Sequence, residues 1–167
     1  MWLPLLFLQV VKAETDFAVD KKIMDVDYFG TIALTKALLP HFIQNQSGHY
    51  VTVTSLMGKF GSPYRSGYCA AKHALHGYFD VMRMEHEKDG VAVTLVCPGF
   101  VQTNVAINAL TADGSPQIKN SETTANGMLL ADFIPKMVRA MEQKKFEVYI
   151  GKKEVLGIYL KRFLPKY

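Results

Sequence analysis

The stretch Ser66-Gly-Tyr-Cys-Ala-Ala-Lys-His-Ala-Leu75 places Tyr68 four residues before Lys72. It opens a segment rich in helix-forming residues, and residues four apart on a helix share one face. We therefore expect a helix from about Gly67 to Lys88, with the tyrosine and the lysine side by side. Its buried side should be an apolar stripe formed by Ala71, Leu75, Tyr78 and Met82.

Two hydrophobic segments flank this helix and have the character of strands. His49 to Thr54 alternates and is rich in β-branched residues, so Ser55 should lie where a buried strand ends. Val91 to Cys97 is almost continuously apolar and is stopped by Pro98-Gly99, as expected of a strand buried on both faces. Strand, helix and strand in this order predict a βαβ unit, and ligands of parallel α/β sheets bind at the carboxyl edge of the strands.

A second tyrosine and lysine at the same spacing, Tyr149 and Lys153, have a different context. They follow a β-like run from Phe146 to Ile150 and straddle Gly151, so they should not stack on one helix face. The Tyr68 pair is therefore the candidate for chemistry. The alternative for that pair is a half-buried helix tyrosine beside a solvated lysine, with Ser55 as a simple strand-end cap.

Three ordered motifs resemble those of the classical short-chain dehydrogenase/reductases, from about Glu14 to Leu160. They are Thr54-Ser-Leu-Met-Gly58, Tyr68-Cys-Ala-Ala-Lys72 and Cys97-Pro-Gly-Phe-Val-Gln-Thr103. Within the family the chain is most similar to the hydroxysteroid-dehydrogenase branch and its "member seven" dehydrogenase/reductase relatives. The resemblance implies an α/β fold, a partial Rossmann-type doubly wound parallel sheet that corresponds to the C-terminal half of the usual domain.

The resemblance also implies how the site would work. Tyr68 would be the general acid/base for a ketone and a secondary alcohol, and Lys72 would lower its pKa by about two units from about 10. Ser55 would hydrogen-bond the reacting oxygen. Lys72 would also hold the nicotinamide ribose. A lipid- or steroid-like substrate is implied by the branch alone.

The cofactor implied by the resemblance is NAD or NADP. Tyr68, Lys72, Pro98 and Gly99 would contribute to its site, and Val101 and Thr103 would face the carboxamide. The chain contains no glycine-rich turn of the kind that holds a dinucleotide pyrophosphate at a helix start, so we expect weak binding by this chain alone. The sequence does not distinguish NAD from NADP.

Asp27 departs from the family pattern. The family usually has an asparagine at this place, whose amide orders a water that links the lysine to solvent. An ionised carboxylate accepts hydrogen bonds but cannot donate them, and it would attract Lys72 while disfavouring the tyrosinate. We include Asp27 among the catalytic positions and expect an impaired relay.

Residues 1–167 are expected to form a single, N-terminally truncated domain. Residues 1–13 form an atypical apolar leader, too short to span a bilayer, and the alternative of a signal peptide lacks a basic start. Leu5 to Val11 could replace the fourth strand of the family's sheet, or be unrelated sequence. Residues 100–128 should form the substrate loop, with Val105, Ile107 and Leu110 giving it an apolar inner surface.

The composition limits other functions. The net charge of +4 is mild, no nucleic-acid recognition motif is present, and the two cysteines lack the close spacing of a zinc site or disulfide scaffold. We expect Cys97 to be a buried thiol and His73 and His76 to be surface residues, so no metal site is predicted. Cys69, beside Tyr68, is either inert or oxidisable.

The expected partners are subunits and a small-molecule carbonyl or alcohol. By resemblance, a helix from about Val19 to Ile43 and the Tyr68 helix would pack against a second copy, giving a homo-oligomer or pairing with full-length subunits. The buried side of the first helix should carry Ile23, Gly30, Leu34, Ala37 and Leu38, and Pro40 should kink or end it.

The last sixteen residues are basic around an apolar run. They are either a solvated tail or a weak membrane-surface contact. We expect a cytoplasmic protein, with association with the endoplasmic reticulum membrane as the alternative. The functional alternative to an NAD(P)-dependent oxidoreductase is a catalytically silent relative that acts only as an oligomerisation partner.

Overall fold

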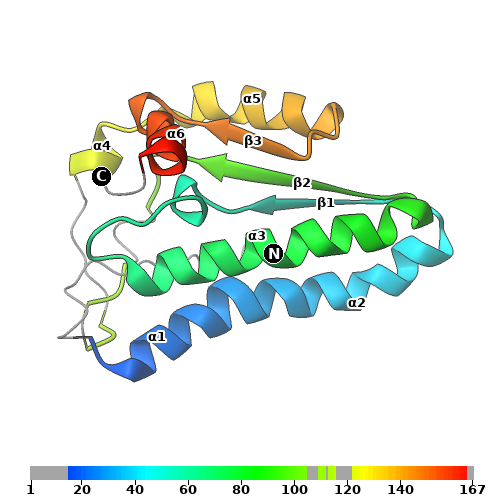
Figure 1. Ribbon diagram of the computed structural model, residues 1–167, viewed down its shortest axis with the longest axis horizontal. Coiled ribbons are helices and arrows are strands. Elements are labelled where there is room, and N and C mark those ends of the chain that lie inside the picture. The colour runs from blue at the N-terminus through cyan, green and yellow to red at the C-terminus, as the bar shows by residue number, and fades with distance from the viewer. Residues whose placement is uncertain (1–14, 105–108, 112, 116–121, 165–167) are drawn as a thin grey trace.

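The computed structural model describes residues 15–104, 109–111, 113–115 and 122–164, so the predicted leader, residues 1–13, lies outside the described residues. Within them, three parallel strands form a sheet in the order β1-β2-β3 (Figure 1). The strands are Gly48–Val53, Val91–Pro98 and Glu147–Ile150. Helices cover both faces, which confirms the predicted Rossmann-type α/β class.

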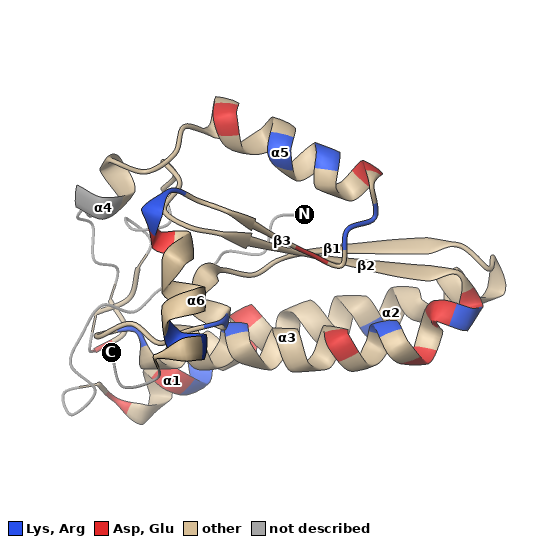
Figure 2. Ribbon diagram, turned by 45° about the horizontal axis from the view of Figure 1, so that its top comes forward, with Lys and Arg blue, Asp and Glu red and all other residues tan. Residues whose placement is uncertain are grey.

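The central strand, β2, is buried along nearly its whole length, because it lies between β1 and β3 and has helices on both sides. Its apolar run satisfies that position without leaving a charged group in the core. Figure 2 shows that charged residues lie on the helices, whereas the strands are almost entirely uncharged. The exception is Glu147 at the start of β3.

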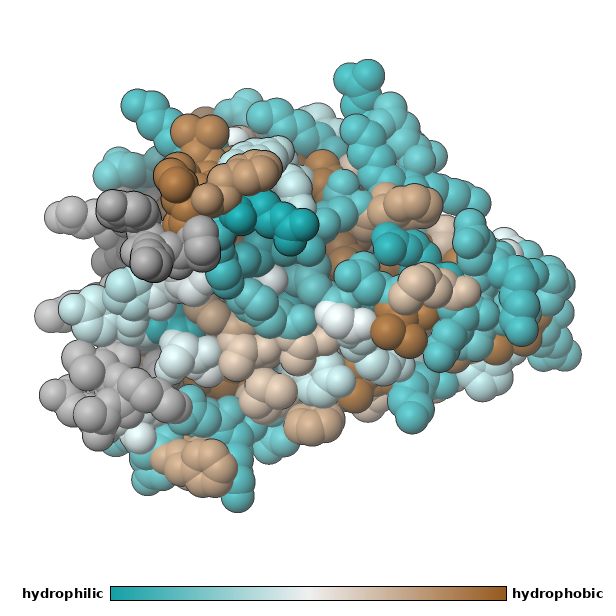
Figure 3. All heavy atoms as spheres, in the orientation of Figure 1, coloured by the Kyte–Doolittle hydropathy of each residue, from teal (hydrophilic) through white to brown (hydrophobic). Residues whose placement is uncertain are grey.

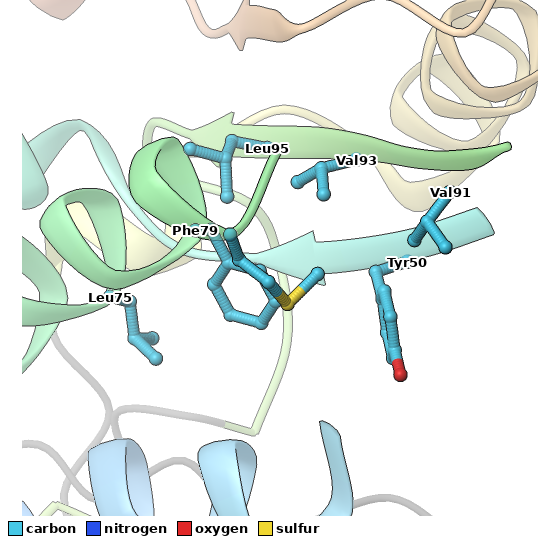
Figure 4. Packing of buried hydrophobic residues seen from close by; sticks show 7 residues of the cluster. Tyr50, Leu75, Phe79, Val91, Val93 and Leu95 are labelled. Carbon is cyan, nitrogen blue, oxygen red and sulfur yellow. The ribbon is translucent and has the colours of Figure 1, made fainter. Parts of the chain in front are cut away.

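One face of the sheet is covered by α3, Ser66–His86, which continues as a 3₁₀ turn, Glu87–Asp89. Gly90 ends the turn at φ +71°, where a Cβ would lie 2.1 Å from the Gln46 carbonyl oxygen, so only glycine fits without strain. The predicted stripe is confirmed as the packing face of α3. Figure 4 shows the resulting core, in which Leu75 and Phe79 meet Tyr50, Val91, Val93 and Leu95 of the sheet.

The predicted first helix is one continuous helical stretch in three parts. It comprises α1, Phe17–Met24, a π-helical turn, Asp25–Phe29, and α2, Gly30–Gln44. The Asp16 side chain caps its start by accepting the Ala18 amide at 2.8 Å. The prediction that Pro40 could end the helix is wrong, because α2 continues through it to Gln44.

The expected buried side of α2 is displaced by one residue. Leu34, Ala37 and Leu38 are exposed, and the sheet is instead met by Tyr28, Ile32, Thr35, Leu39 and Phe42. A π turn holds one more residue than an α turn, so the stripe that begins correctly at Ile23 shifts in phase after residue 29. Thr35 is accommodated because its hydroxyl donates to the Thr31 carbonyl at 2.9 Å, and its own carbonyl accepts the Tyr50 hydroxyl at 2.7 Å.

The other face of the sheet is covered by α5, Leu130–Glu142, whose Phe133 packs with Val96 and Ile150. A short helix, α4, spans Glu122–Ala125, and α6 spans Leu156–Phe163 after a 3₁₀ turn at Lys153–Val155. Figure 3 shows a hydrophobic patch near α6 within a mostly hydrophilic surface. Among the described residues, no helix combines the length and apolar character needed to cross a bilayer.

Candidate active site

Ser55 lies directly beyond β1, at the carboxyl edge of the sheet. The ladder continues to Thr54, whose amide donates to the Val96 carbonyl at 2.8 Å. Ser55 then turns the chain, and its Oγ accepts the Met57 amide at 3.1 Å at the start of a 3₁₀ turn, Leu56–Gly58. The predicted strand-end position is confirmed, and the serine also has the capping role of the alternative interpretation.

Tyr68 and Lys72 lie on the first turns of α3 and reach the same place as Ser55. Tyr68 shares a side-chain hydrogen bond with Ser55. The Lys72 ammonium lies 5.3 Å from the centre of the Tyr68 ring, and its side chain is only 1% exposed. The alternative of a solvated lysine is therefore wrong. By contrast, Tyr149 lies in β3 and Lys153 in the turn beyond it, so that pair does not share a helix face.

Asp27 is the partner of Lys72. Its Oδ2 lies 3.5 Å from the Lys72 Nζ, and both side chains are buried. The π-helical turn carries Asp27 toward α3, and the Thr31 hydroxyl satisfies the Asp27 backbone carbonyl at 3.0 Å. The Asp27 carboxylate thus neutralises the charge of Lys72, and Lys72 in turn lies beside Tyr68.

The electrostatics of Tyr68 differ from the sequence-based prediction. Burial disfavours the phenolate and raises the pKa of Tyr68 well above its ordinary value. The hydrogen bond with Ser55 lowers this pKa, whereas the Asp27 charge raises it further. The direction is opposite to the predicted fall in pKa, because burial of the phenol is the largest cause of the shift. Tyr68 is therefore a neutral phenol at physiological pH and a proton donor.

Lys72 is subject to the same competition. Burial lowers the pKa of Lys72, while the charge and the hydrogen bond of Asp27 raise it. Asp27 therefore helps Lys72 to keep its proton at the cost of disfavouring the tyrosinate. The two carboxylate effects act in opposite directions on the acid/base chemistry.

A small cavity of about 70 Å³ opens beside Tyr68. Its lining includes most of the predicted cofactor positions and several apolar side chains. The lining residues are Ser55, Leu56, Met57, Arg65, Tyr68, Pro98, Gly99, Phe100, Val101, Thr124 and Glu154. Lys72 lies behind the tyrosine ring and Thr103 is exposed outside this lining. The structure thus brings Ser55, Tyr68, Pro98, Gly99 and Val101 together around one opening.

Glu154 and Arg65 also line the cavity, although neither was predicted from the sequence. Glu154 comes from the turn after β3, and its Oε1 accepts the Phe100 amide at 3.1 Å. Arg65 precedes α3 and lies 5.6 Å from the Phe100 ring centre. Neither residue belongs to a motif, and only the parallel pairing of β2 with β3 places the Glu154 turn here.

The comparisons with known proteins agree with this geometry. The sequence profile of the short chain dehydrogenase family matches residues 9–113. Dehydrogenase/reductase SDR family member 7B of Bos taurus is 40% identical over 153 residues, which make up 91% of this chain and 47% of that protein. Dehydrogenase/reductase SDR family protein 7-like of Drosophila melanogaster is 37% identical over 154 residues, or 92% and 47% of the two chains. The chain spans about half the length of these curated relatives.

Solved structures show the same fold. A short-chain dehydrogenase from Streptomyces avermitilis superposes with a TM-score of 0.79 at 20% identity, covering 95% of this chain and 62% of that one. A 4-hydroxyisoleucine dehydrogenase complexed with NADH and succinate gives a TM-score of 0.69 at 20% identity, with coverages of 89% and 67%. The profile match over most of the chain, together with the parallel sheet and its tyrosine-lysine helix, establishes that the chain belongs to the short-chain dehydrogenase family of oxidoreductases.

Proposed function

We propose that the chain carries the catalytic half of an NAD(P)-dependent oxidoreductase that interconverts a ketone and a secondary alcohol. The observation that carries the proposal is the grouping of Ser55 and Tyr68, joined by a hydrogen bond, at a cavity on the carboxyl edge of the sheet, with Lys72 behind the tyrosine. The alternative of a silent oligomerisation partner is not favoured, because the three side chains retain the arrangement that acid/base chemistry needs.

The residues present fit the nicotinamide end of a dinucleotide. Pro98, Gly99 and Val101 line the cavity with Tyr68, and an NADH complex is known for the 4-hydroxyisoleucine dehydrogenase of the same fold. When bound, the cofactor would supply or accept the hydride. The chain does not favour NAD over NADP, because the residues that would contact the adenosine ribose are not identified in it.

The protein's own groups would move the proton. In reduction, the Tyr68 hydroxyl would donate its proton to the carbonyl oxygen, and Ser55 would hydrogen-bond the same oxygen as negative charge develops there. Lys72 would stabilise the phenolate that results. In the opposite direction Tyr68 would act as the base and would first have to lose its proton, which its raised pKa opposes.

The proposed substrate is a lipid- or steroid-like carbonyl. Apolar side chains of Leu56, Met57, Phe100 and Val101 line much of the cavity. In the predicted substrate loop, Leu110 is buried against Val19, Ile23 and Ala71, whereas Val105 and Ile107 lie outside the described residues.

Two surfaces support the proposed partners. Leu34 and Leu38 on α2 and Val81 and Met84 on α3 are exposed apolar residues, as expected of helices that pair with a second subunit. On α6, exposed Tyr159, Leu160 and Phe163 lie beside Lys161 and Arg162, which suits a weak contact with a membrane surface. We propose a cytoplasmic location with such contact at the endoplasmic reticulum as the alternative.

The chain alone should bind NADH or NADPH weakly, with a Kd on the order of 1 mM or higher. The few contacts at the nicotinamide end must order a flexible, charged ligand without a glycine-rich helix start to hold its pyrophosphate. Isothermal titration of the 167-residue chain with both cofactors measures this. Low-micromolar binding of one cofactor per chain would show that another segment or a partner subunit supplies the pyrophosphate site.

Replacing Asp27 by asparagine should raise the activity per folded molecule. Removing the negative charge lowers the pKa of Tyr68, and a shift of about one unit corresponds to about a tenfold change in alcohol oxidation below that pKa. The pH profile of oxidation should therefore move to lower pH in Asp27→Asn.

The exposed Asp80→Asn serves as the matched control and should leave the profile unchanged. The measurement is initial rate against pH in a form of the protein with measurable turnover. A profile that moves to higher pH in Asp27→Asn would mean that Lys72 needs the carboxylate to keep its proton.

A further inference from the structure

A second polar cluster lies between α3 and the sheet. It consists of His76 on α3, Cys97 near the end of β2 and Glu147 at the start of β3, whose ligand-type atoms lie within 4.8 Å of one another. The three side chains come from positions 76, 97 and 147, so only the assembled sheet and helix bring them together. None of them lines the cavity beside Tyr68.

The prediction that His76 is a surface residue is wrong, whereas His73 is exposed as expected. His76 is only 5% exposed, since it lies one turn beyond Lys72 on the buried side of α3, under Gly58. Its Nδ1 lies 3.3 Å from the Glu147 Oε1 but makes no hydrogen bond with any described residue. A buried imidazole nitrogen without a hydrogen bond is unfavourable unless it has another ligand.

The donor set suits a borderline divalent cation. Zinc binds imidazole nitrogen, carboxylate oxygen and thiolate sulfur at about 2.0–2.3 Å, so tetrahedral neighbours are separated by about 3.3–3.6 Å. The Glu147 Oε1 lies 3.3 Å from the His76 Nδ1 and 3.4 Å from the Cys97 Sγ. The Cys97 Sγ lies 3.8 Å from the other ring nitrogen, Nε2. The two ring nitrogens face different partners, and one atom from each of the three residues lies within 4.8 Å of the others, so a small shift of the His76 ring would complete a three-ligand zinc site.

Further contacts would orient the ligands. The Tyr149 hydroxyl donates to the Glu147 Oε2 at 2.9 Å, and the Thr54 hydroxyl donates to the Cys97 Sγ at 3.3 Å. Hydrogen bonds of this kind fix the position and basicity of metal ligands. The Lys59 ammonium lies 2.7 Å from the Glu147 Oε1, where it would compete with a cation.

The same three residue types could suggest a nucleophilic cysteine activated by histidine. Cys97 is 0% exposed, however, and no described cavity reaches its sulfur. A substrate has no access to it. A metal ion could enter from the Glu147 side, because that carboxylate is 25% exposed and the Lys59 beside it is also partly exposed.

We propose that His76, Cys97 and Glu147 bind a divalent cation of the zinc type, which links α3 to the second and third strands of the sheet. Binding would release the Cys97 thiol proton to solvent as the sulfur becomes a thiolate ligand. The fourth position would be taken by water, with Lys59 turned outward. This site is independent of the proposed oxidoreductase chemistry at Tyr68.

Titration of the metal-free 167-residue chain with Co²⁺ tests the proposal. One cobalt per chain should bind and produce the near-ultraviolet thiolate-to-cobalt charge-transfer band, and Zn²⁺ should displace it. Cys97→Ser should abolish the band, and Tyr149→Phe should weaken binding by about tenfold. His73→Gln, which changes an exposed histidine on the same helix, should change nothing.

Lys59→Met distinguishes a metal site from a purely structural cluster, because only in a metal site does the Lys59 ammonium compete with a cation for Glu147. Removing the competing ammonium should tighten cobalt binding by about tenfold or more if the cation shares Glu147. The side chain is partly exposed, so this variant does not disturb the core. Unchanged or weaker binding in Lys59→Met, or an undiminished band in Cys97→Ser, would overturn the proposal.

Discussion

Tyr68→Phe should lower carbonyl reduction by about 10²–10⁴-fold, the usual contribution of a positioned acid or base. The phenylalanine keeps the ring that packs with Met57 and Cys69 and removes only the hydroxyl bonded to Ser55. The measurement is the initial rate of NADH and NADPH oxidation with a series of apolar ketones. It requires a form of the protein with measurable turnover.

Tyr159→Phe is the matched control, since it removes the same hydroxyl from an exposed position on α6. It should retain the full rate. Thermal unfolding of both variants should stay close to that of the unchanged protein, because neither loses an apolar contact. Comparable turnover in Tyr68→Phe would show that the acid lies elsewhere and would remove the basis of the proposed function.

Lys72→Met should lower the free energy of unfolding by about 3–5 kcal/mol at neutral pH. Methionine fills a similar volume, but it leaves the Asp27 carboxylate in a buried position without the cation 3.5 Å away. Breaking one side of a buried ion pair costs more than the pair contributes, because the remaining charge is desolvated and uncompensated. Urea denaturation followed by circular dichroism measures the loss.

The double variant Lys72→Met/Asp27→Asn distinguishes this cause from lost packing. It removes both charges and should recover most of the stability, whereas a packing defect would persist. Lys36→Met, on the exposed side of α2, should be close to neutral. A double variant as unstable as Lys72→Met alone would contradict the ion-pair explanation.

The sheet and the helix that carries Tyr68 could be predicted because their signals are local. An almost continuous apolar run predicted β2, a two-residue alternation predicted β1, and a four-residue spacing placed Tyr68 beside Lys72. The position of Ser55 followed from where a strand must end. These features depend on the periodicity of each element, which the sequence records directly.

Other features depend on distant groups and could not be predicted in this way. The pKa of Tyr68 is raised because burial outweighs the nearby charges, and burial is a property of the assembled fold. His76 looked like a surface residue because its helix face could be judged only against Cys97 and Glu147, which lie on two separate strands. Glu154 reaches the cavity only through the pairing of β3 with β2.

The π-helical turn at Asp25–Phe29 makes the exposed face of α2 depend on how many residues this one turn contains. It allows two consecutive residues, Asp27 and Tyr28, to point inward, one to Lys72 and the other to the sheet core. If the same five residues formed a regular α turn instead, every residue after the turn would rotate by about 100° about the helix axis. Leu34 and Leu38 would then exchange places with Thr35 between surface and interior, so the exposed face of α2 is set by the one extra residue in the turn beside Lys72.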